Sequence, residues 1–428
     1  MRISAAALLV LLCTAASGGA VSLTLGGLGA APAESAQALY ASNAGGHPVL
    51  ITETGSKAPG GATFIEMGVP SMAPDGRVFF GAEIAEPGGN QSWDIFVADA
   101  EAPPAQRVVR ALRPGPLSAA CSPHFRTDPY PVADAEGEIA FVAPDAVHRD
   151  TLFLYSGGTL SCLAAVGSET NKGHKISILS YGTIQMGERG FVTFTGFLKG
   201  DETSGSRADL QALLMASPKT GVIELAVEGE LGPNRTRYRR PFGLPAALAS
   251  PEGTLIAFTA KTESGGALFL YRGGVMARIL PTGTLTAAGP VTYLSAGRPG
   301  LMSDGTTAVL VGCARVPAIF RLARGRLDLR IQRGQLTPLG TELEALGDPV
   351  LTQSGAMLVG ATDSNQREKL YVLDFDDAFF EVGNTAMLYK IAMTSGDQMT
   401  SADQAEHSIF TGTLTANQRG DFAYLGGK

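Results

Sequence analysis

Short apolar runs that alternate with glycine turns recur along most of the chain and define its repeating unit. In the stretch 70–80, a proline precedes the turn Asp75-Gly76, and the β-type run Val78-Phe79-Phe80 follows it. β-Branched and aromatic residues on both sides of a tight glycine turn are typical of a β-hairpin. Related stretches lie at 131–141, 299–310 and 349–359. In all four stretches the proline lies six positions before the turn glycine.

The turn glycines divide the chain into repeats. Seven of them occur at intervals of 50 to 65 residues: Gly76, Gly137, Gly190, Gly253, Gly305, Gly355 and Gly420. After each of the first six hairpins, the chain contains a second apolar run, which in most repeats carries an aliphatic-aromatic pair such as Ile95-Phe96 or Leu268-Phe269. Another glycine turn and a last apolar run complete the unit. Each repeat therefore predicts four antiparallel strands.

The two ends of the mature chain complement each other. The hairpin around Gly420 has no second hairpin after it, and the hairpin at 38–52 has no first hairpin before it. An open sheet edge is a liability, so pairing of these halves is favoured. We predict an all-β fold, a seven-bladed β-propeller with six whole blades and one split blade that joins the N-terminal and C-terminal hairpins. A row of β-sandwich domains is the alternative, but sandwiches need about 100 residues each.

The repeat unit in residues 71–80 resembles the WD40-like repeat of TolB-type propellers. A Gly-x-Pro sequence precedes several units, at 68–70, 243–245, 297–299 and 347–349. With this addition the chain is similar to a group of exported bacterial tandem-repeat proteins without assigned function. The resemblance covers nearly the whole mature chain. It implies a propeller fold and no particular chemistry.

The N-terminus has the features of an export signal. Arg2 precedes an apolar run at 5–16, and Ala31-Pro32-Ala33 offers small residues for cleavage. We therefore expect a signal peptide at 1–33, a propeller domain at 34–428, and a periplasmic or extracellular monomer without a membrane span in the mature chain. An uncleaved anchor that extends to residue 31 is the alternative.

Composition narrows the class of protein. Hydrophobic residues make up 45 %, charged residues only 17 %, and there are 54 glycines, which suits a turn-rich all-β chain. The net charge of −7 argues against nucleic-acid binding. In an oxidising compartment we predict a disulfide between Cys121 and Cys162, which both belong to the second repeat or its entry, and a free Cys313. Three free buried thiols are the alternative.

Three successive connections between repeats carry basic and aromatic residues, and they would be neighbours in a ring. The predicted ligand-binding residues are His124, Arg126, Tyr130, Lys172, His174, Lys175, Arg235, Arg237, Tyr238, Arg239 and Arg240. Arginine forks suit carboxylates and phosphates, so we predict an acidic protein or an anionic polysaccharide as the partner, on the face of the long loops. A solvated loop without a ligand is the alternative.

Signatures of catalysis and of metal or cofactor binding are missing from the sequence. No Gly-x-Ser-x-Gly or His-Glu-x-x-His motif occurs, and the histidines are scattered. Asp374, Asp376 and Asp377 lack the glycine-containing loop of a calcium site. We therefore expect no catalytic residue, metal or cofactor, and favour a non-catalytic binding scaffold. The alternative is a hydrolase or lyase that acts on a polysaccharide in the propeller funnel.

Overall fold

The structure is a computed structural model. It describes residues 37–42, 49–112, 122–134, 136–187, 190–200, 209–314, 316–338, 340–352, 355–365, 368–373, 379–382, 408–409, 415–416 and 422–427. Contacts divide the chain into the units 1–35 and 36–428, and every described residue belongs to the second unit. In the described part, no helix is long and apolar enough to cross a membrane. The predicted signal peptide lies outside the described residues.

The first blade shows how the repeat folds. Its strands are β3 (Thr63–Met67), β4 (Ser71–Met72), β5 (Val78–Ala85), β6 (Gln91–Ala98) and β7 (Val108–Leu112). They form one antiparallel sheet in the order β3-β5-β6-β7, with β4 also beside β5. The turn glycine Gly76 has φ +92°, and the five other described turn glycines also have positive φ. Glycine adopts this conformation without steric cost, which explains its recurrence.

Five further blades repeat this order along the chain. The second comprises β8 (Val132–Ala133), β9 (Ile139–Pro144), β10 (Asp150–Ser156) and β11 (Thr159–Ala165). The third comprises β12 (Ile176–Leu179), β13 (Gln185–Met186), β14 (Val192–Leu198), β15 (Leu210–Ser217) and β16 (Gly221–Val227). The fourth comprises β17 (Tyr238–Phe242), β18 (Ala246–Ser250), β19 (Gly253–Thr262), β20 (Gly265–Arg272) and β21 (Val275–Pro281).

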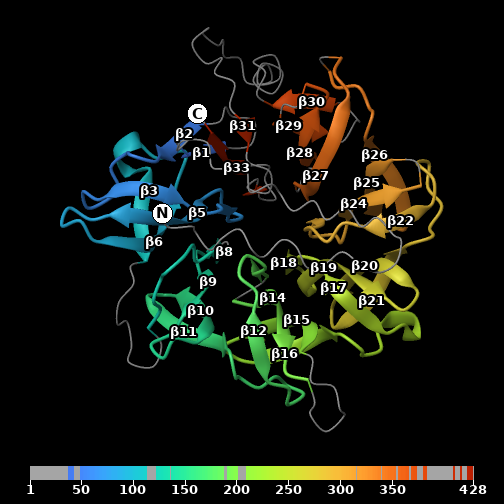
Figure 1. Cartoon of the computed structure of the whole chain (residues 1–428), viewed down its shortest axis with the longest axis horizontal. Coiled ribbons are helices and arrows are strands. Elements are labelled where there is room, and N and C mark those ends of the chain that lie inside the picture. The colour runs from blue at the N-terminus through green and yellow to red at the C-terminus, as the bar shows by residue number, and fades with distance from the viewer. Residues whose placement is uncertain are drawn as a thin grey trace, which may run out of the picture. The chain divides into compact units, whose positions relative to one another are not determined.

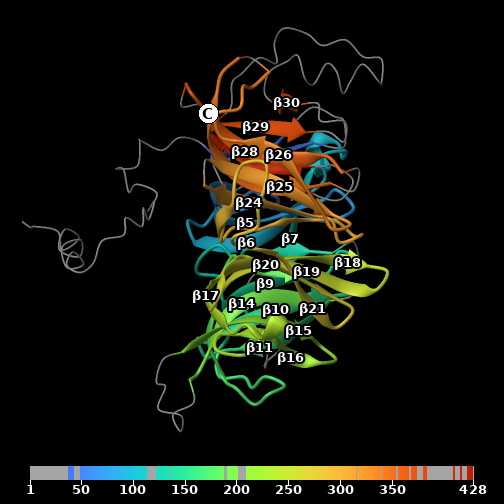
Figure 2. The same ribbon diagram turned by 90° about the vertical axis from the view of Figure 1, so that its right-hand side faces the viewer.

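The fifth and sixth blades complete the series. The fifth comprises β22 (Val291–Leu294), β23 (Gly300–Leu301), β24 (Thr307–Cys313), β25 (Pro317–Ala323) and β26 (Arg326–Gln332). The sixth comprises β27 (Leu343–Leu351), β28 (Met357–Asp363), β29 (Glu368–Leu373) and β30 (Phe379–Val382). The short inner strands β4, β8, β13, β18 and β23, followed by β27, contact one another in chain order, so the blades follow each other around a ring (Figures 1 and 2).

The predicted count of seven blades is corrected to six. We count as a blade a sheet that one continuous segment of the chain forms, and six sheets meet this definition. Between the sixth and the first blade lies a different sheet, here called the closing sheet, in the order β2-β1-β33-β31 with β32 beside β33. Its strands are β1 (Gln37–Ser42), β2 (Val49–Glu53), β31 (Ser408–Ile409), β32 (Thr415–Ala416) and β33 (Phe422–Gly427).

The closing sheet joins the two ends of the chain, as the complementary hairpins predict. β1 pairs antiparallel with β33 from Gln37↔Gly427 to Ser42↔Phe422, and β32 contacts both β27 and β4. Its described buried residues do not form a cluster of their own. Leu39, Ala41 and Ala423 pack into the hydrophobic cluster of the first blade. The physical reason for the corrected count is that neither chain end supplies a whole repeat.

Aromatic pairs across the central hairpin form the core of the blades. Phe96 lies opposite Phe80 with ring centroids 5.6 Å apart, and Phe153 lies opposite Phe141 at 5.3 Å. Both pairs are stacked, and all four side chains are buried. The aliphatic-aromatic pairs in the sequence therefore mark the third strand of a blade, where cross-strand aromatic contact stabilises the sheet.

The Gly-x-Pro motif connects the first blade to the second and the fifth blade to the sixth. The middle residue donates its backbone N–H to the following blade: Val69 N to Asp128 Oδ2 at 3.0 Å, and Arg298 N to Asp348 Oδ2 at 3.1 Å. A β-carbon at the preceding glycine would overlap the same carboxylate, that of Asp128 for Gly68 and that of Asp348 for Gly297. Glycine is thus required there for close approach.

Replacement of Gly297 by alanine is expected to destabilise the fold by about 1–3 kcal/mol, because the new methyl group displaces a buried carboxylate from its donor. Gly360→Ala is the matched control, since no atom lies within 4 Å of a β-carbon at that strand position. We expect the control to stay within about 0.5 kcal/mol of the wild type. Urea unfolding measures both values. Equal stability of the two variants would contradict this role of the motif.

Candidate functional site

Five of the described connections between neighbouring sheets are short hairpins of common construction. A glycine donates its backbone N–H to the start of the next blade, as in Gly167 N to Ile176 O at 2.8 Å and Gly229 N to Tyr238 O at 2.9 Å. Corresponding bonds start from Gly55, Gly283 and Gly334. In the sequence, this hairpin is marked by a glycine that recurs after the last strand of a repeat. The predicted site was based on the basic residues and did not use this glycine. We call 122–131, 166–175 and 228–237 the first, second and third links.

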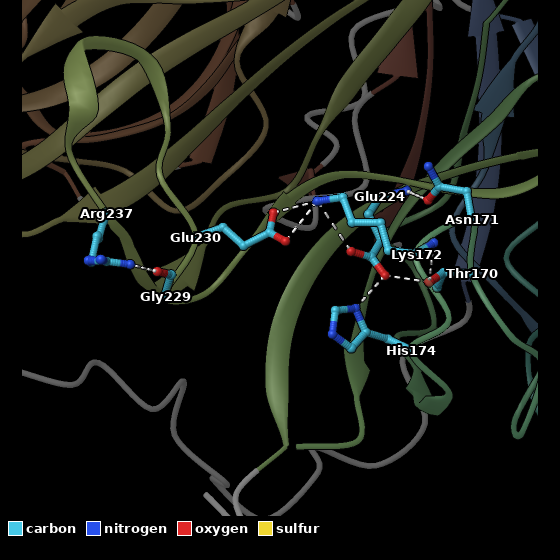
Figure 3. Close-up of polar contacts among 8 residues, drawn as sticks. All are labelled: Thr170, Asn171, Lys172, His174, Glu224, Gly229, Glu230 and Arg237. Carbon is cyan, nitrogen blue, oxygen red and sulfur yellow. Dashed lines mark hydrogen bonds and ion pairs between the residues drawn. The ribbon is translucent and has the colours of Figure 1, made fainter. Parts of the chain in front are cut away.

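Glu224 is the centre of the polar contacts in the second link (Figure 3). Its side chain projects from β16 and is fully buried. The hydroxyl of Thr170 donates to Glu224 Oε1, His174 Nδ1 lies 2.8 Å from the same oxygen, and Lys172 Nζ lies 3.5 Å from Oε2. Asn171 Oδ1 accepts the backbone N–H of Glu224 at 3.0 Å. A buried carboxylate requires such partners.

The second and third links are joined by Lys172. Its ammonium group lies 2.7 Å from both carboxylate oxygens of Glu230, which belongs to the third link (Figure 3). Burial acts against the charge of Lys172, but the hydrogen bond and charge of Glu230, together with Glu224, raise its pKa. Lys175 Nζ lies 3.9 Å from Glu169. The cationic side chains of the second link are therefore largely occupied by carboxylates of the same protein.

Arg239 and Arg240 are likewise paired. Arg239 Nη2 lies 3.0 Å from Glu263, and Arg240 Nη2 lies 2.9 Å from Glu228. Tyr238 is buried in the cluster between the third and fourth blades, where its ring packs edge-on against Phe269 with centroids 5.2 Å apart. Burial, and then the charge of Glu230, raises the pKa of Tyr238. The structure thus places Tyr238 in the core.

Arg235 and Arg237 differ from these residues because no carboxylate in the described part of the chain pairs with them. Both are exposed, and Arg237 Nη1 donates to the carbonyl of Gly229 at 2.8 Å (Figure 3). Arg278 of β21 approaches the residue between them, with Nη1 3.5 Å from Thr236 Oγ1. Its other described contact is Ser264 Oγ at 3.0 Å. We call Arg235, Arg237 and Arg278 the arginine cluster.

The sequence pattern misses Arg278 because it lies in the outer strand of the next blade, 41 residues beyond Arg237. The short helix η4 (Pro233–Arg235) contacts β21, and this contact brings Arg278 to the third link. The described partners of these three guanidinium groups are hydroxyl or carbonyl oxygens, or there is none. The groups therefore remain able to attract an anion. Guanidinium groups stay charged at any working pH and can bind a planar anion with two parallel hydrogen bonds.

The first link differs from this group, as no described hydrogen bond or ion pair joins it to the other two links. His124 and Arg126 are exposed and meet His148: the rings of His124 and His148 have centroids 6.3 Å apart, and Arg126 Nη2 lies 3.3 Å from His148 Nδ1. Tyr130 is half-buried, and its ring lies against Gly182 near the inner strands. Burial, with the charges of Asp128 and Glu66, raises the pKa of Tyr130.

Arg298 lies among the inner strands and was not predicted from the sequence. Its Nε donates to Pro245 O at 3.2 Å, and Nη2 lies 3.5 Å from Gly182 O, so the side chain spans from the fifth to the third blade. Surrounding protein lowers the pKa of Arg298 to about 10, although Asp348 opposes the shift. Some of the residue remains solvent-accessible. In the sequence, the only signal for this contact between blades is the place of Arg298 in the Gly-x-Pro motif.

The carboxylates of the inner strands serve the fold. Burial raises the pKa of Asp128 to about 6, while the N–H groups of Tyr130 and Val69 act in the opposite direction. Asp348 accepts hydrogen bonds from Arg298 N and from Ser295 Oγ, the latter at 3.1 Å. In both side chains the oxygens are used to join successive blades. Among the described residues, no three His, Cys, Asp or Glu side chains are grouped as metal ligands.

The cysteines are described in part. Cys162 is disulfide-bonded, but its partner is outside the described residues, as is Cys121, so this pairing stays a prediction. Cys313 is a buried free thiol. Asp374, Asp376 and Asp377 also lie outside the described residues.

Comparison with known proteins identifies one family and distant structural neighbours. The family of unknown function DUF7453 matches residues 104–428. No curated protein matches the chain. The WD40-like and TolB-type assignment is not tested by this family match and stays a prediction.

The solved structures that resemble the chain are diverse. A puromycin-hydrolysing peptidase of Mycobacterium tuberculosis is 13 % identical with a TM-score of 0.48, over 82 % of this chain and 48 % of the peptidase. Prolyl oligopeptidase B of Galerina marginata is 9 % identical with a TM-score of 0.44, over 74 % and 43 %. The BP39L lectin of Burkholderia pseudomallei is 11 % identical with a TM-score of 0.39, over 81 % and 95 %. This chain thus spans less than half of either peptidase.

Proposed function

The chain belongs to the DUF7453 family, whose function is unknown, and we propose that it is an exported, non-catalytic binding scaffold built from WD40-like repeats. The proposed ligand is an anionic polysaccharide or an acidic protein surface. The binding site is the arginine cluster of the third link. The observation that carries this proposal is the contrast between its unpaired guanidinium groups and the paired cations beside them.

The charge balance of the links supports this position. Lys172, Arg239 and Arg240 each have a carboxylate partner within 3.0 Å, whereas no described carboxylate pairs with Arg235 or Arg237. The protein carries a net charge of −7, so a local excess of cations is uncommon on it. Such an excess attracts acidic ligands, because binding restores the missing partners.

The rigidity of the third link also favours binding. Gly229 N, Gly232 N and Tyr238 N all donate within the hairpin, at 2.9, 2.8 and 3.0 Å. The buried Tyr238 anchors its end. A preorganised loop loses little conformational entropy when it binds a ligand.

Two features support export. Arg2 and the apolar run at 5–16 form the pattern of a signal peptide. Cys162 is disulfide-bonded, and disulfides persist in oxidising compartments.

The triple variant Arg235→Ser/Arg237→Ser/Arg278→Ser is expected to lose binding to a polyuronate such as alginate, or to an acidic protein, by at least about tenfold. Wild-type affinity should also fall as salt rises above about 0.15 M, where the Debye length is near 8 Å. Biolayer interferometry with immobilised polyuronate and with an acidic protein measures both effects.

The matched control is Arg239→Ser/Arg240→Ser, which removes neighbouring arginines that are already paired. We expect this control to retain most of the wild-type affinity. Melting temperatures establish that both variants fold, since exposed substitutions rarely cost more than about 0.5 kcal/mol. Equal losses in the two variants, or unchanged binding in the triple variant, would place the site elsewhere.

A further inference from the structure

A hollow of about 500 Å³ lies between the closing sheet and the first blade. β2 and the adjoining connection at 56–59 form one side. The other side is formed by residues 104–108, which include the short helix η2 (Pro104–Gln106) and the start of β7. The hollow exists because the outer strand of one sheet faces a turn of the next. A concave site with mixed apolar and polar lining is typical of small-ligand binding.

Arg107 supplies the first cation of this hollow. Its Nη1 donates to the carbonyl of Leu50 at 3.0 Å, which fixes the guanidinium group against β2. Its Nε is buried without a hydrogen-bond partner, and no described carboxylate pairs with the residue. The guanidinium group therefore has donors that the protein leaves unused. The described hydrogen bond to Leu50 O uses one of the five guanidinium donors, so an acceptor from a ligand would find unused donors on the terminal nitrogens.

Lys57 supplies the second cation. It is exposed, and its described hydrogen bond is from Nζ to Thr63 Oγ1 at 3.2 Å. One carboxylate, that of Glu53, also lines the hollow. Two cations against one acid leave the lining with an excess positive charge.

The remaining lining is suited to a sugar ring. Thr52 and Ser56 contribute hydroxyl groups that are hydrogen-bonded to each other at 2.9 Å, and Ser56 Oγ donates to Glu53 O at 2.6 Å, so their oxygens can act as acceptors toward a ligand. Pro59 and Pro104 add apolar surfaces. A sugar acid combines the same elements, since it has a carboxylate, several hydroxyl groups and apolar C–H faces.

We propose that this hollow binds a uronate, the carboxylate-bearing sugar unit of an acidic glycan. Arg107 and Lys57 bind the carboxylate, and the hydroxyl groups and Glu53 face the ring hydroxyls. The site lies between the closing sheet and the first blade, far along the sequence from the arginine cluster. It therefore does not depend on the proposed role of that cluster.

A second hollow provides a comparison. It has a volume of about 530 Å³ and lies between the fourth and fifth blades, where Leu270, Leu280, Leu322 and Leu327 form much of its lining. Three arginines and one acid, Asp304, also line it, but Arg272 lies 2.6 Å from Glu252 and Arg326 lies 3.6 Å from Asp328. The third arginine, Arg324, is exposed. This hollow is more apolar and suits a sugar acid less well. Arg324→Ala therefore serves as a control, because it removes an arginine from a hollow that is not expected to bind the sugar acid.

Isothermal titration calorimetry of the full mature chain with galacturonate tests the proposal. Glucose, which lacks the carboxylate, and inorganic phosphate are titrated in parallel. We expect saturable binding of galacturonate and at least about tenfold weaker binding of glucose and phosphate. Arg107→Lys keeps a charge and a donor for Leu50 O but loses the planar fork, and it should weaken galacturonate binding about tenfold or more. Lys57→Ser should weaken it several-fold, and Arg324→Ala should leave it unchanged.

Three results would overturn the proposal: no galacturonate binding by the wild type, equal binding of galacturonate and glucose, or unaltered galacturonate binding by both Arg107→Lys and Lys57→Ser. Tighter binding of phosphate than of galacturonate would also overturn it in favour of a phosphate site. Because Lys57 is exposed, its variant remains informative even if Arg107→Lys does not fold. Loss of polyuronate binding in the arginine-cluster variant alone, with galacturonate binding intact, would distinguish the two sites.

Discussion

Removal of residues 412–428 is expected to lower the stability of the fold by several kcal/mol. The deletion removes β32 and β33 and leaves β1 without the partner to which it is paired over six residues. Each cross-strand pair contributes about 0.2–1 kcal/mol, and exposure of a buried leucine costs about 1.5–3 kcal/mol more. Leu39 is such a residue, with no solvent exposure. A total on the order of 5 kcal/mol follows from these terms.

The deletion also creates new sheet edges. The hairpin β1–β2 would be left as an isolated two-stranded unit, and such hairpins are marginally stable in water. The cluster of the first blade would lose Ala423, and it would also lose Leu39 and Ala41 whenever the remaining hairpin detaches. We therefore expect aggregation of the truncated chain on heating, in addition to a lower melting temperature.

Differential scanning calorimetry measures the effect. Removal of Lys428 alone is the control, because this residue lies beyond β33. The control should melt like the wild type. A chain truncated at residue 411 that also melts like the wild type would show that the closing sheet does not hold the ring together.

Stability is also expected to fall as the pH rises from about 4 to 7, because of a carboxyl pair in the second blade. Burial raises the pKa of Asp134 from 3.8 to about 7. The backbone N–H of Glu138 acts against this shift, whereas the side-chain hydrogen bond and the charge of Glu138 add to it. Asp134 Oδ1 accepts the backbone N–H groups of Glu136 and Glu138 at 3.1 and 2.9 Å. The charge of Glu138 favours the protonated form of Asp134, since two adjacent carboxylates repel each other.

The direction of this pH dependence follows from the number of protons that the folded and unfolded chains bind. Above pH 3.8 the unfolded chain releases the proton of Asp134, whereas the folded protein keeps it until about pH 7. The contribution is fully present below pH 3.8 and is lost as the pH rises through the folded pKa. Three pKa units correspond to at most about 4 kcal/mol. Burial of Asp128, whose folded pKa is raised to about 6, acts in the same direction.

The variant Asp134→Asn isolates this contribution. Its amide oxygen still accepts the two backbone N–H groups, and its amide can donate to Glu138 at any pH. We expect the variant to be more stable than the wild type at pH 8 and to show a smaller loss of stability between pH 4 and 8. Urea unfolding across this range measures the difference. Asp304→Asn, at a turn beside Arg272, is the control and should leave the pH dependence unchanged. Parallel curves for wild type and Asp134→Asn would contradict the raised pKa of Asp134.

Part of the candidate site is readable from the sequence. Arg235 and Arg237 stand out as a basic run in an acidic protein, and the structure leaves them without described carboxylate partners. The carboxylates that pair with the neighbouring cations could not be recognised from the sequence in the same way. Glu224 and Glu263 lie in or beside strands far along the sequence from their partners, and their pairing with His174 and Arg239 depends on which strands lie side by side.

The repeating hairpin follows from the sequence because its signals are local. A glycine such as Gly76 tolerates positive φ. A strand such as β5 turns Phe80 toward one hydrophobic cluster and the adjacent Phe79 toward another, with the period of two that strands impose. The pairing of the two chain ends also follows, since each end lacks the half-repeat that the other supplies. These features need only spacing and residue type.

The tertiary structure decides everything that depends on two blades at once. The count of six blades with a closing sheet, the approach of Arg278 to Thr236, and the hollow beside Arg107 all arise from packing between segments far apart in sequence. A local sequence pattern does not specify how far apart two such segments lie in the folded protein. Whether a charged side chain meets an acid, a carbonyl or water is set by that distance, because electrostatic energy and burial both depend on position in space.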